Sequence, residues 1–180
     1  MIKVAFGMIV FEGDYVLQEC LQQVYPFASQ ILIAEGPDKG KKTSSDKTND
    51  ILHGFPDPEQ KITIVHDQFK EKDNQCNAYI KHLNPEIDYL WNLDSDEIYK
   101  TKHLETTLDF LENHKPTSVG VRSRSFYGGF DHYLTGFELN CDNFLRIFRV
   151  TEGCSWLTHR PPTIRYPLNS NITKKHIDSE

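Results

Sequence analysis

The amino-acid sequence predicts a single α/β domain of Rossmann-like type, with a mostly parallel central sheet flanked by helices. The length of 180 residues suits one domain with one core. Hydrophobic residues make up 38% of the chain and charged residues 26%, which is typical of a globular protein. Short apolar runs alternate with segments of helical periodicity, and this alternation favours parallel strands with helices on both faces of the sheet.

The amino-terminal quarter of the chain predicts a strand, a helix and a second strand. Residues 2–10 form an apolar run that is typical of a buried strand. From residue 15 the apolar side chains recur four apart, which predicts a helix, and Pro26 ends it. Residues 31–34 are again apolar and predict the second strand.

Four further elements are predicted between residues 45 and 93. A short helix that Ser45 or Asp46 caps runs through residue 52, and a third strand covers 62–65. Residues 74–83 have a helical pattern that Asn-Pro closes. Residues 89–93, Tyr-Leu-Trp-Asn-Leu, predict the fourth strand.

The last part of the chain predicts one helix and two strands, followed by a tail. Residues 102–113 place leucines on one helix face, and residues 118–126 and 144–150 have strand-like patterns. The polar tail 169–180 is expected to be loosely held, so the predicted domain covers residues 1–168.

Charge and cysteine content exclude several functional classes. The net charge is −6, which argues against nucleic-acid binding, because that binding depends on clustered basic side chains. No run of about 18 apolar residues predicts a membrane span, and no signal peptide is apparent. The cysteines, which form no CxxC pair, are expected to be reduced and mostly buried: Cys20, Cys76, Cys141 and Cys154. Together these features predict a cytoplasmic protein.

The acidic segment 94–97, Asp-Ser-Asp-Glu, carries the chemistry. It follows the fourth predicted strand, and open α/β sheets bind ligands beyond the carboxyl ends of their strands. Carboxylates this close repel one another unless a cation or a proton intervenes. Asp94 and Asp96 are therefore predicted to hold Mn²⁺ or Mg²⁺, hard cations that take oxygen ligands and often share phosphate oxygens of a substrate.

Two other carboxylate motifs do not fit. A haloacid-dehalogenase phosphatase has its Asp-x-Asp after the first strand, whereas Asp94 follows the fourth. An EF-hand loop needs a Gly at its sixth position and a Glu at its twelfth, and this segment has neither pattern.

With these residues the chain resembles family 2 glycosyltransferases, which have the GT-A fold. The closest resemblance is at residues 93–97, which are similar to the family's Asp-x-Asp segment. Other segments resemble family motifs in chain order: residues 7–13, 15–25, 31–36, 44–48 and 72–78. Phe11 stands where many members have Asn, and Arg160 follows His159 where the family pattern has Glu.

The resemblance implies a nucleotide-sugar site. Glu35 would accept hydrogen bonds from the uracil or ribose of a UDP-linked donor, and Asp46 would hold the same nucleoside. Asp94 would contact the ribose or a metal-bound water, Asp96 would bind the cation, and His159 would reach the cation or the β-phosphate. A turn carboxylate, a helix cap and a structural histidine remain the plainer interpretations of Glu35, Asp46 and His159.

The resemblance also implies transfer of the sugar to a hydroxyl acceptor, with inversion. Inversion needs a general base, for which Asp142 and Glu138 are the candidates; Asp131 is a third. Asp142 is favoured because it lies nearer the segment 146–149, Arg-Ile-Phe-Arg, which also resembles a family pattern. The acceptor, whether a saccharide, a lipid-linked sugar or a protein, is left open.

Two segments have alternative interpretations. The aromatic residues 126–130 would form an acceptor wall or a strand turn, and the basic run Lys39, Lys41 and Lys42 would be a solvated loop or a donor-phosphate contact.

Three alternatives to an active transferase stay open. A degenerate domain that only binds nucleotide or sugar would explain the missing Asn and Glu. A sugar nucleotidyltransferase would need a Gly-rich, Arg-containing loop after the first strand, which residues 11–14 lack. The chain is also short for a GT-A domain, which suits a piece of a longer polypeptide.

Overall fold

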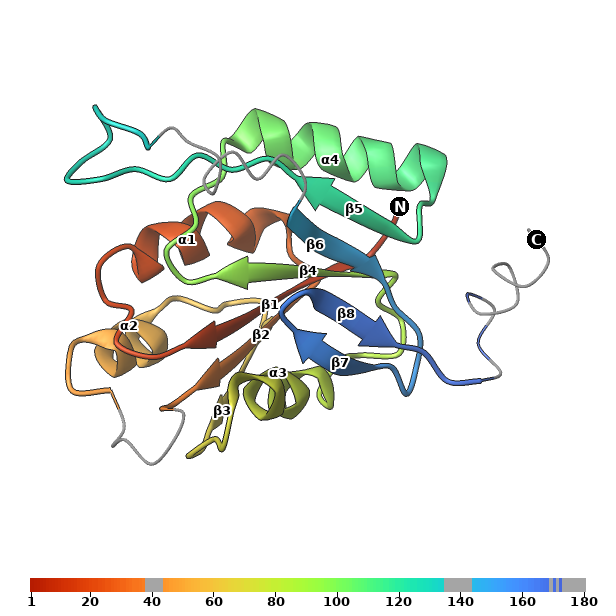
Figure 1. The fold of residues 1–180 in the computed structure, drawn as a ribbon, viewed down its shortest axis with the longest axis horizontal. Helices are drawn as coiled ribbons and strands as arrows, with labels where there is room; N and C mark the ends of the chain where they lie inside the picture. The colour runs from red at the N-terminus through yellow and green to blue at the C-terminus, as the bar shows by residue number, and fades with distance from the viewer. Residues whose placement is uncertain (38–43, 135–143, 169, 171, 173–180) are drawn as a thin grey trace.

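The computed structural model describes residues 1–37, 44–134, 144–168, 170 and 172 (Figure 1). Strands and short helices alternate through its first two thirds. The elements are β1 (Val4–Val10), α1 (Leu17–Val24), η1 (Tyr25–Phe27), β2 (Gln30–Glu35), α2 (Thr48–Gly54), β3 (Ile62–His66), α3 (Lys72–Ile80), β4 (Tyr89–Asp94), α4 (Thr101–His114), β5 (Ser118–Val121), β6 (Phe144–Arg149), β7 (Ser155–His159) and β8 (Pro162–Arg165).

The central sheet has six strands in the order β3-β2-β1-β4-β6-β5. The first four are mutually parallel, whereas β6 runs antiparallel to both β4 and β5. The predicted fold class, α/β with a mostly parallel sheet, is therefore confirmed. Figure 1 shows the arrows of β1, β2 and β4 pointing to one edge of the molecule.

One face of the sheet packs against α1, α2 and α4. Helix α1 buries its apolar stripe there, because Leu17, Cys20, Leu21 and Val24 recur at helical spacing. From the sheet, Phe6 and Trp91 meet these side chains, with ring centroids 5.4 Å apart. This face holds the larger part of the hydrophobic core.

The opposite face packs against α3 and against the hairpin of β7 and β8. Asn77 joins the two, since its side chain accepts from the backbone of Trp156 at 2.9 Å and donates to its carbonyl at 3.0 Å. The Trp156 indole lies edge-on to Phe148 of β6. The sequence analysis predicted helices on both faces, but it did not predict this hairpin.

Several element boundaries differ from the prediction. The helix predicted from residue 15 begins at Leu17, and beyond Val24 a 3₁₀ turn accommodates Pro26. The strand predicted over 118–126 ends at Val121, because within that segment β6 pairs with residues 118–121. Farther on, the chain pairs with itself through the isolated bridge between Phe126 and Tyr133.

The cysteines in the described part of the chain are free and buried, as predicted: Cys20, Cys76 and Cys154. Cys141 lies outside the described residues, as do most residues of the predicted tail 169–180. Ser170 and Ile172 are described and are buried. In the described part of the chain, each helix is too short or too polar to cross a bilayer.

Candidate functional site

The carboxyl ends of β1, β2 and β4 bring several of the predicted site residues to one edge of the sheet. Glu35 is the last residue of β2, and Asp94 is the last residue of β4. Their strands flank β1, in which Ile9 pairs with Asp94 and Val10 pairs with Glu35. Adjacent strands lie about 4.8 Å apart, so this edge collects residues that are distant in sequence.

The Asp-Ser-Asp segment forms a turn directly after β4. The backbone N–H of Glu97 donates to the carbonyl of Asp94 at 3.1 Å and closes the turn. Asp96 is exposed, and the side chain of Asp94 is 42% exposed. A Cβ placed on Gly13 would lie 3.0 Å from the Ser95 hydroxyl, so the turn packs directly against the loop after β1.

Arg146, on β6, binds two carboxylates of this acidic segment. Its Nη2 lies 2.5 Å from Oδ2 of Asp94 and 2.5 Å from Oε1 of Glu97. The other oxygen of Glu97 accepts from the Tyr99 hydroxyl at 2.8 Å. Burial acts to lower the pKa of the guanidinium, but Glu97 and Asp94 raise it above its ordinary value. Burial raises the pKa of Glu97, and Arg146 offsets part of that effect.

The carboxylate of Glu35 is bound by protein groups. Its Oε2 lies 3.0 Å from Nδ1 of His66, and its Oε1 accepts from the backbone N–H of Ser44 at 3.4 Å. Its side chain is only 1% exposed. Glu35 therefore lies at the predicted edge, but contact with a nucleoside would require it to share these bonds, and that contact stays a prediction.

Asp46 connects two loops at the same edge. It accepts from the backbone of Asp14 at 3.2 Å and from the backbone of Thr48, the first residue of α2, at 3.0 Å. Burial acts to raise the pKa of Asp46, but the hydrogen bonds from Thr48 and Asp14 lower it overall. The Thr48 hydroxyl accepts from Gly13 at 2.8 Å, so the loops after β1 and β2 are tied together.

Gln75, on α3, hydrogen-bonds to the backbone at the ends of β1 and β2. Its buried amide Nε2 donates to the carbonyls of Ala34 at 2.9 Å, Gly36 at 3.1 Å and Val10 at 3.4 Å. These carbonyls lie at or just past the strand ends, and that of Val10 also accepts from the backbone N–H of Gly36 at 3.0 Å. The sequence analysis noted the segment 72–78 but assigned no role to Gln75.

His159, at the end of β7, is held by Asp73 at the start of α3. One oxygen of Asp73 accepts from the His159 backbone at 2.7 Å and lies 2.6 Å from the ring Nδ1. The hydrogen bond from the His159 ring lowers the pKa of Asp73 below its ordinary value. A carboxylate on Nδ1 is the arrangement that orients many metal-binding histidines, because it fixes the ring with Nε2 outward.

The arrangement of the predicted metal ligands can be described, while metal binding itself stays a prediction. Within the described ranges, no group of three or more His, Cys, Asp or Glu side chains is placed to hold a metal ion. His159 therefore does not form a ready-made cluster with Asp94 and Asp96. Two aspartates on a turn nevertheless suit Mg²⁺ or Mn²⁺, which bind through one or two carboxylates, waters and substrate phosphates.

The general-base candidates Asp142 and Glu138 lie outside the described residues, and so do Lys39, Lys41 and Lys42. Asp131 is exposed in a loop that projects at the same edge as the strand ends (Figure 1). Aromatic side chains in that loop are exposed, with Tyr127 at 75% and Phe130 at 68%. The alternatives of acceptor wall and strand turn are compatible with this loop.

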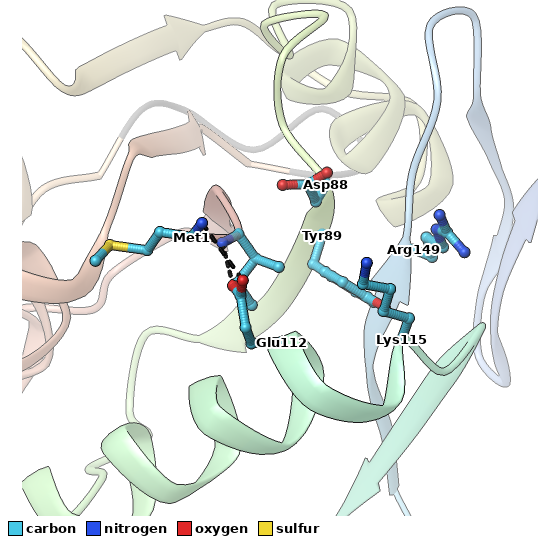
Figure 2. Close-up of a pocket in the computed structure, with 7 residues that line it drawn as sticks. Met1, Asp88, Tyr89, Glu112, Lys115 and Arg149 are labelled. Carbon is cyan, nitrogen blue, oxygen red and sulfur yellow. Dashed lines mark hydrogen bonds and ion pairs between the residues drawn. The ribbon is translucent and has the colours of Figure 1, made fainter.

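A hollow with a volume of about 240 Å³ lies at the opposite edge of the sheet (Figure 2). It is lined by Met1, Ile2, Asp88, Tyr89, Glu112, Lys115 and Arg149. Tyr89 begins β4 and Arg149 ends β6, so this hollow is one strand length from Asp94. It does not include any predicted site residue.

Comparison with known proteins identifies the family. The sequence profile described as glycosyl transferase family 2 matches residues 42–167, which include the Asp94-Ser95-Asp96 turn. The chain belongs to glycosyl transferase family 2. The family predicted from the sequence is thereby confirmed, and the enzyme class of that family is glycosyltransferase. No curated protein sequence matches the chain.

Solved structures of TarS from S. aureus share the fold. TarS 1-349 superposes with a TM-score of 0.61 at 11% identity, over 82% of this chain and 47% of that one. The same fragment in complex with UDP-GlcNAc gives a TM-score of 0.53 at 13% identity, over 71% and 36%. The complex with UDP also gives 0.53, at 14% identity, over 71% and 37%. This chain thus spans about half the length of TarS 1-349 or less.

Proposed function

We propose that this chain transfers a sugar from a nucleoside-diphosphate sugar, with UDP as the favoured nucleotide, to a hydroxyl acceptor. One observation carries the proposal: the Asp94-Ser95-Asp96 turn, in which Asp96 is exposed, stands at the carboxyl end of a central parallel strand. Open α/β sheets bind ligands at this place. Membership of glycosyl transferase family 2 gives the reaction class.

The donor's nucleoside is assigned to the loops after β1 and β2. Glu35 and Asp46 are the polar side chains that the sequence analysis named for it, and both lie at these loops. TarS, which has the same fold, was crystallised with UDP and with UDP-GlcNAc. The choice of UDP rests on this likeness and on the family.

The donor's diphosphate is assigned to the turn after β4. Asp96 and Asp94 would hold Mn²⁺ or Mg²⁺, and His159 is a further candidate ligand from β7. The cation would neutralise the charge that develops on the departing nucleoside diphosphate. Asp96 is exposed, so its carboxylate is open to a ligand.

The acceptor hydroxyl must lose a proton in an inverting transfer, which we propose here. Asp142, Glu138 and Asp131 are the candidate bases. All three belong to the region 131–142, between β5 and β6. Because β5 runs in the same direction as β4, its following loop starts at the edge that carries Asp94.

Calorimetric titration with UDP and with GDP, each with and without Mn²⁺, tests the proposal. We expect UDP to bind much more tightly with Mn²⁺ than without it, and more tightly than GDP. Asp96→Ala should remove the Mn²⁺-dependent part while leaving the unfolding midpoint unchanged, because Asp96 is exposed. Asp109→Ala, which removes an exposed carboxylate from α4, is the matched control. Equal UDP affinity with and without Mn²⁺ would contradict the site.

A second candidate function is a degenerate domain that binds nucleotide or sugar without turnover. Phe11 in place of the family's Asn and Arg160 in place of its Glu favour this reading. Hydrolysis or transfer assays with a panel of UDP-sugars distinguish the two. Mn²⁺-dependent UDP binding without release of UDP from any donor supports the degenerate domain.

A further inference from the structure

Arg146 already forms an ion pair with Asp94, one of the carboxylates that are predicted to bind the metal ion. The guanidinium of Arg146 shares Nη2 between Asp94 and Glu97, at 2.5 Å from each. The Arg146 side chain is 12% exposed, and the Asp94 side chain is 42% exposed. The positive charge of Arg146 is therefore largely buried, while the carboxylate of Asp94 remains accessible to solvent.

The two carboxylates that Arg146 binds differ in exposure, and the more exposed one, Asp94, is the easier to release. Glu97 is 20% exposed and is itself held by the Tyr99 hydroxyl, so it anchors the guanidinium. A guanidinium is a planar fork of donors that suits phosphate oxygens as well as carboxylates, so a diphosphate can take the place of Asp94 at Arg146 while Glu97 stays bound.

From this geometry we propose that Arg146 is a resident counter-ion of Asp94, which makes cation binding depend on the donor's diphosphate. The inference rests on the proposed function and names a positioning residue within that same site. Without donor, Arg146 occupies an oxygen of Asp94 and repels a divalent cation. A diphosphate gives the guanidinium an alternative anion and brings its own ligands to the cation.

The sign of the effect follows from electrostatics. Removing Arg146 frees Oδ2 of Asp94 and removes one positive charge from the vicinity of the cation. Both changes favour the bare cation, and at ångström-scale separations a unit charge alters such an affinity by about tenfold or more. If Arg146 served only to orient Asp94, its removal would instead weaken cation binding. Coupling between two ligands is reciprocal. The factor by which Mn²⁺ raises the affinity for the donor must therefore fall as well.

The experiment measures Mn²⁺ affinity by calorimetry in the whole chain, without nucleotide and with saturating UDP, at constant ionic strength. For Arg146→Met we expect bare Mn²⁺ to bind about tenfold more tightly than in the wild type. The Mn²⁺ affinity with saturating UDP, divided by the Mn²⁺ affinity without nucleotide, should fall by a similar factor. Arg146→Lys retains the charge and should stay close to the wild type.

Arg149→Met is the matched control, because it removes the other arginine of β6 at the opposite edge of the sheet (Figure 2). It should leave both Mn²⁺ affinities unchanged. If Arg146→Met does not fold, Arg146→Met with Glu97→Gln removes both charges of the buried pair, so the local net charge is unchanged, and freeing Oδ2 of Asp94 should still tighten Mn²⁺ binding, by less than about tenfold. Unchanged or weaker bare Mn²⁺ binding in the folded variant overturns the inference.

Failure of the proposed function has a different signature. It appears in the wild type, as UDP affinity that is the same with and without Mn²⁺. The counter-ion role is measured from Mn²⁺ alone, in variants compared with the wild type. If the wild type shows no bare Mn²⁺ binding, detectable binding in Arg146→Met supports the inference, and its absence counts against it.

Discussion

Glu35 at the end of β2 is paired with His66 at the end of β3, with 3.0 Å between Oε2 and Nδ1. The Glu35 side chain is 1% exposed, whereas that of His66 is 40% exposed. The contact between Oε2 and Nδ1 holds the His66 ring in one orientation against the end of β2. The pair thus presents His66, backed by Glu35, at the edge where the nucleoside is proposed to bind.

The first prediction concerns this pair. Glu35→Ala removes the buried partner of His66 and leaves space at the end of β2, so it should lower the free energy of unfolding by about 1–3 kcal/mol. Glu35→Gln keeps an acceptor oxygen and should cost less. Urea denaturation gives the values, with Glu105→Ala on the exposed face of α4 as the control. Equal losses in both Glu35 variants would contradict the role of the hydrogen bond.

The second prediction concerns Gln75, whose amide donates to three backbone carbonyls. Gln75→Leu keeps the volume but removes the side-chain donor from three carbonyls, of which that of Val10 keeps the backbone N–H of Gly36. It should lower the free energy of unfolding by about 1–3 kcal/mol, measured by urea denaturation. Gln18→Leu on the exposed face of α1 is the control. A loss no larger than that of the control would show that the carbonyls find other partners.

The alternating part of the fold could be predicted because each buried strand there is a continuous apolar run. Strands β1, β2 and β4 are almost wholly buried, and their sequences have that pattern. The hairpin β7–β8 could not be predicted in this way. Trp156 and Ile164 are its buried side chains, so its two short strands have no continuous apolar run.

The site was predicted in part, for a similar reason. The position of Asp94 and Asp96 follows from the strand before them, which is a local signal. The pairing of Arg146 with Asp94 joins residues 52 positions apart through an antiparallel strand, and nothing in the local pattern indicates it. The segment around Arg146 was recognised by resemblance, but its contact depends on sheet order, which the sequence left open.

The third prediction concerns pH and the contact between Asp73 and His159. The hydrogen bond from His159 lowers the pKa of Asp73 in the folded protein below its ordinary value of 3.8. The contact therefore stabilises the fold above that value, and this contribution is lost as the pH falls through the lowered pKa. Asp73→Asn lacks the titrating group, so its unfolding midpoint should fall less between about pH 5 and pH 2 than that of the wild type. Differential scanning calorimetry measures the midpoints.

Asp109→Asn is the control for this series, because it removes an exposed carboxylate of α4. Its unfolding midpoint should fall with decreasing pH by as much as that of the wild type. If the unfolding midpoints of the wild type and of Asp73→Asn fall equally as the pH is lowered, this contact does not contribute to acid sensitivity.

The fourth prediction links the loop after β1 to the turn after β4. A Cβ on Gly13 would lie 3.0 Å from Oγ of Ser95 and 3.2 Å from Cγ1 of Val10, so Gly13→Ala must displace its neighbours by a few tenths of an ångström. Because Ser95 stands between Asp94 and Asp96, we expect this shift to weaken Mn²⁺-dependent UDP binding by up to about tenfold, since small misplacements of binding groups are costly. Titration calorimetry measures the change.

The cause of that loss can be isolated with a second substitution. Ser95→Ala removes the Oγ that the new methyl group meets first, so Gly13→Ala combined with Ser95→Ala should recover part of the affinity. The control is Gly54→Ala at the end of α2, where an added Cβ meets nothing within 4 Å, and UDP binding should be unchanged there. Strictly additive losses in the double variant would mean that Gly13 acts on the site by a route other than its contact with Ser95.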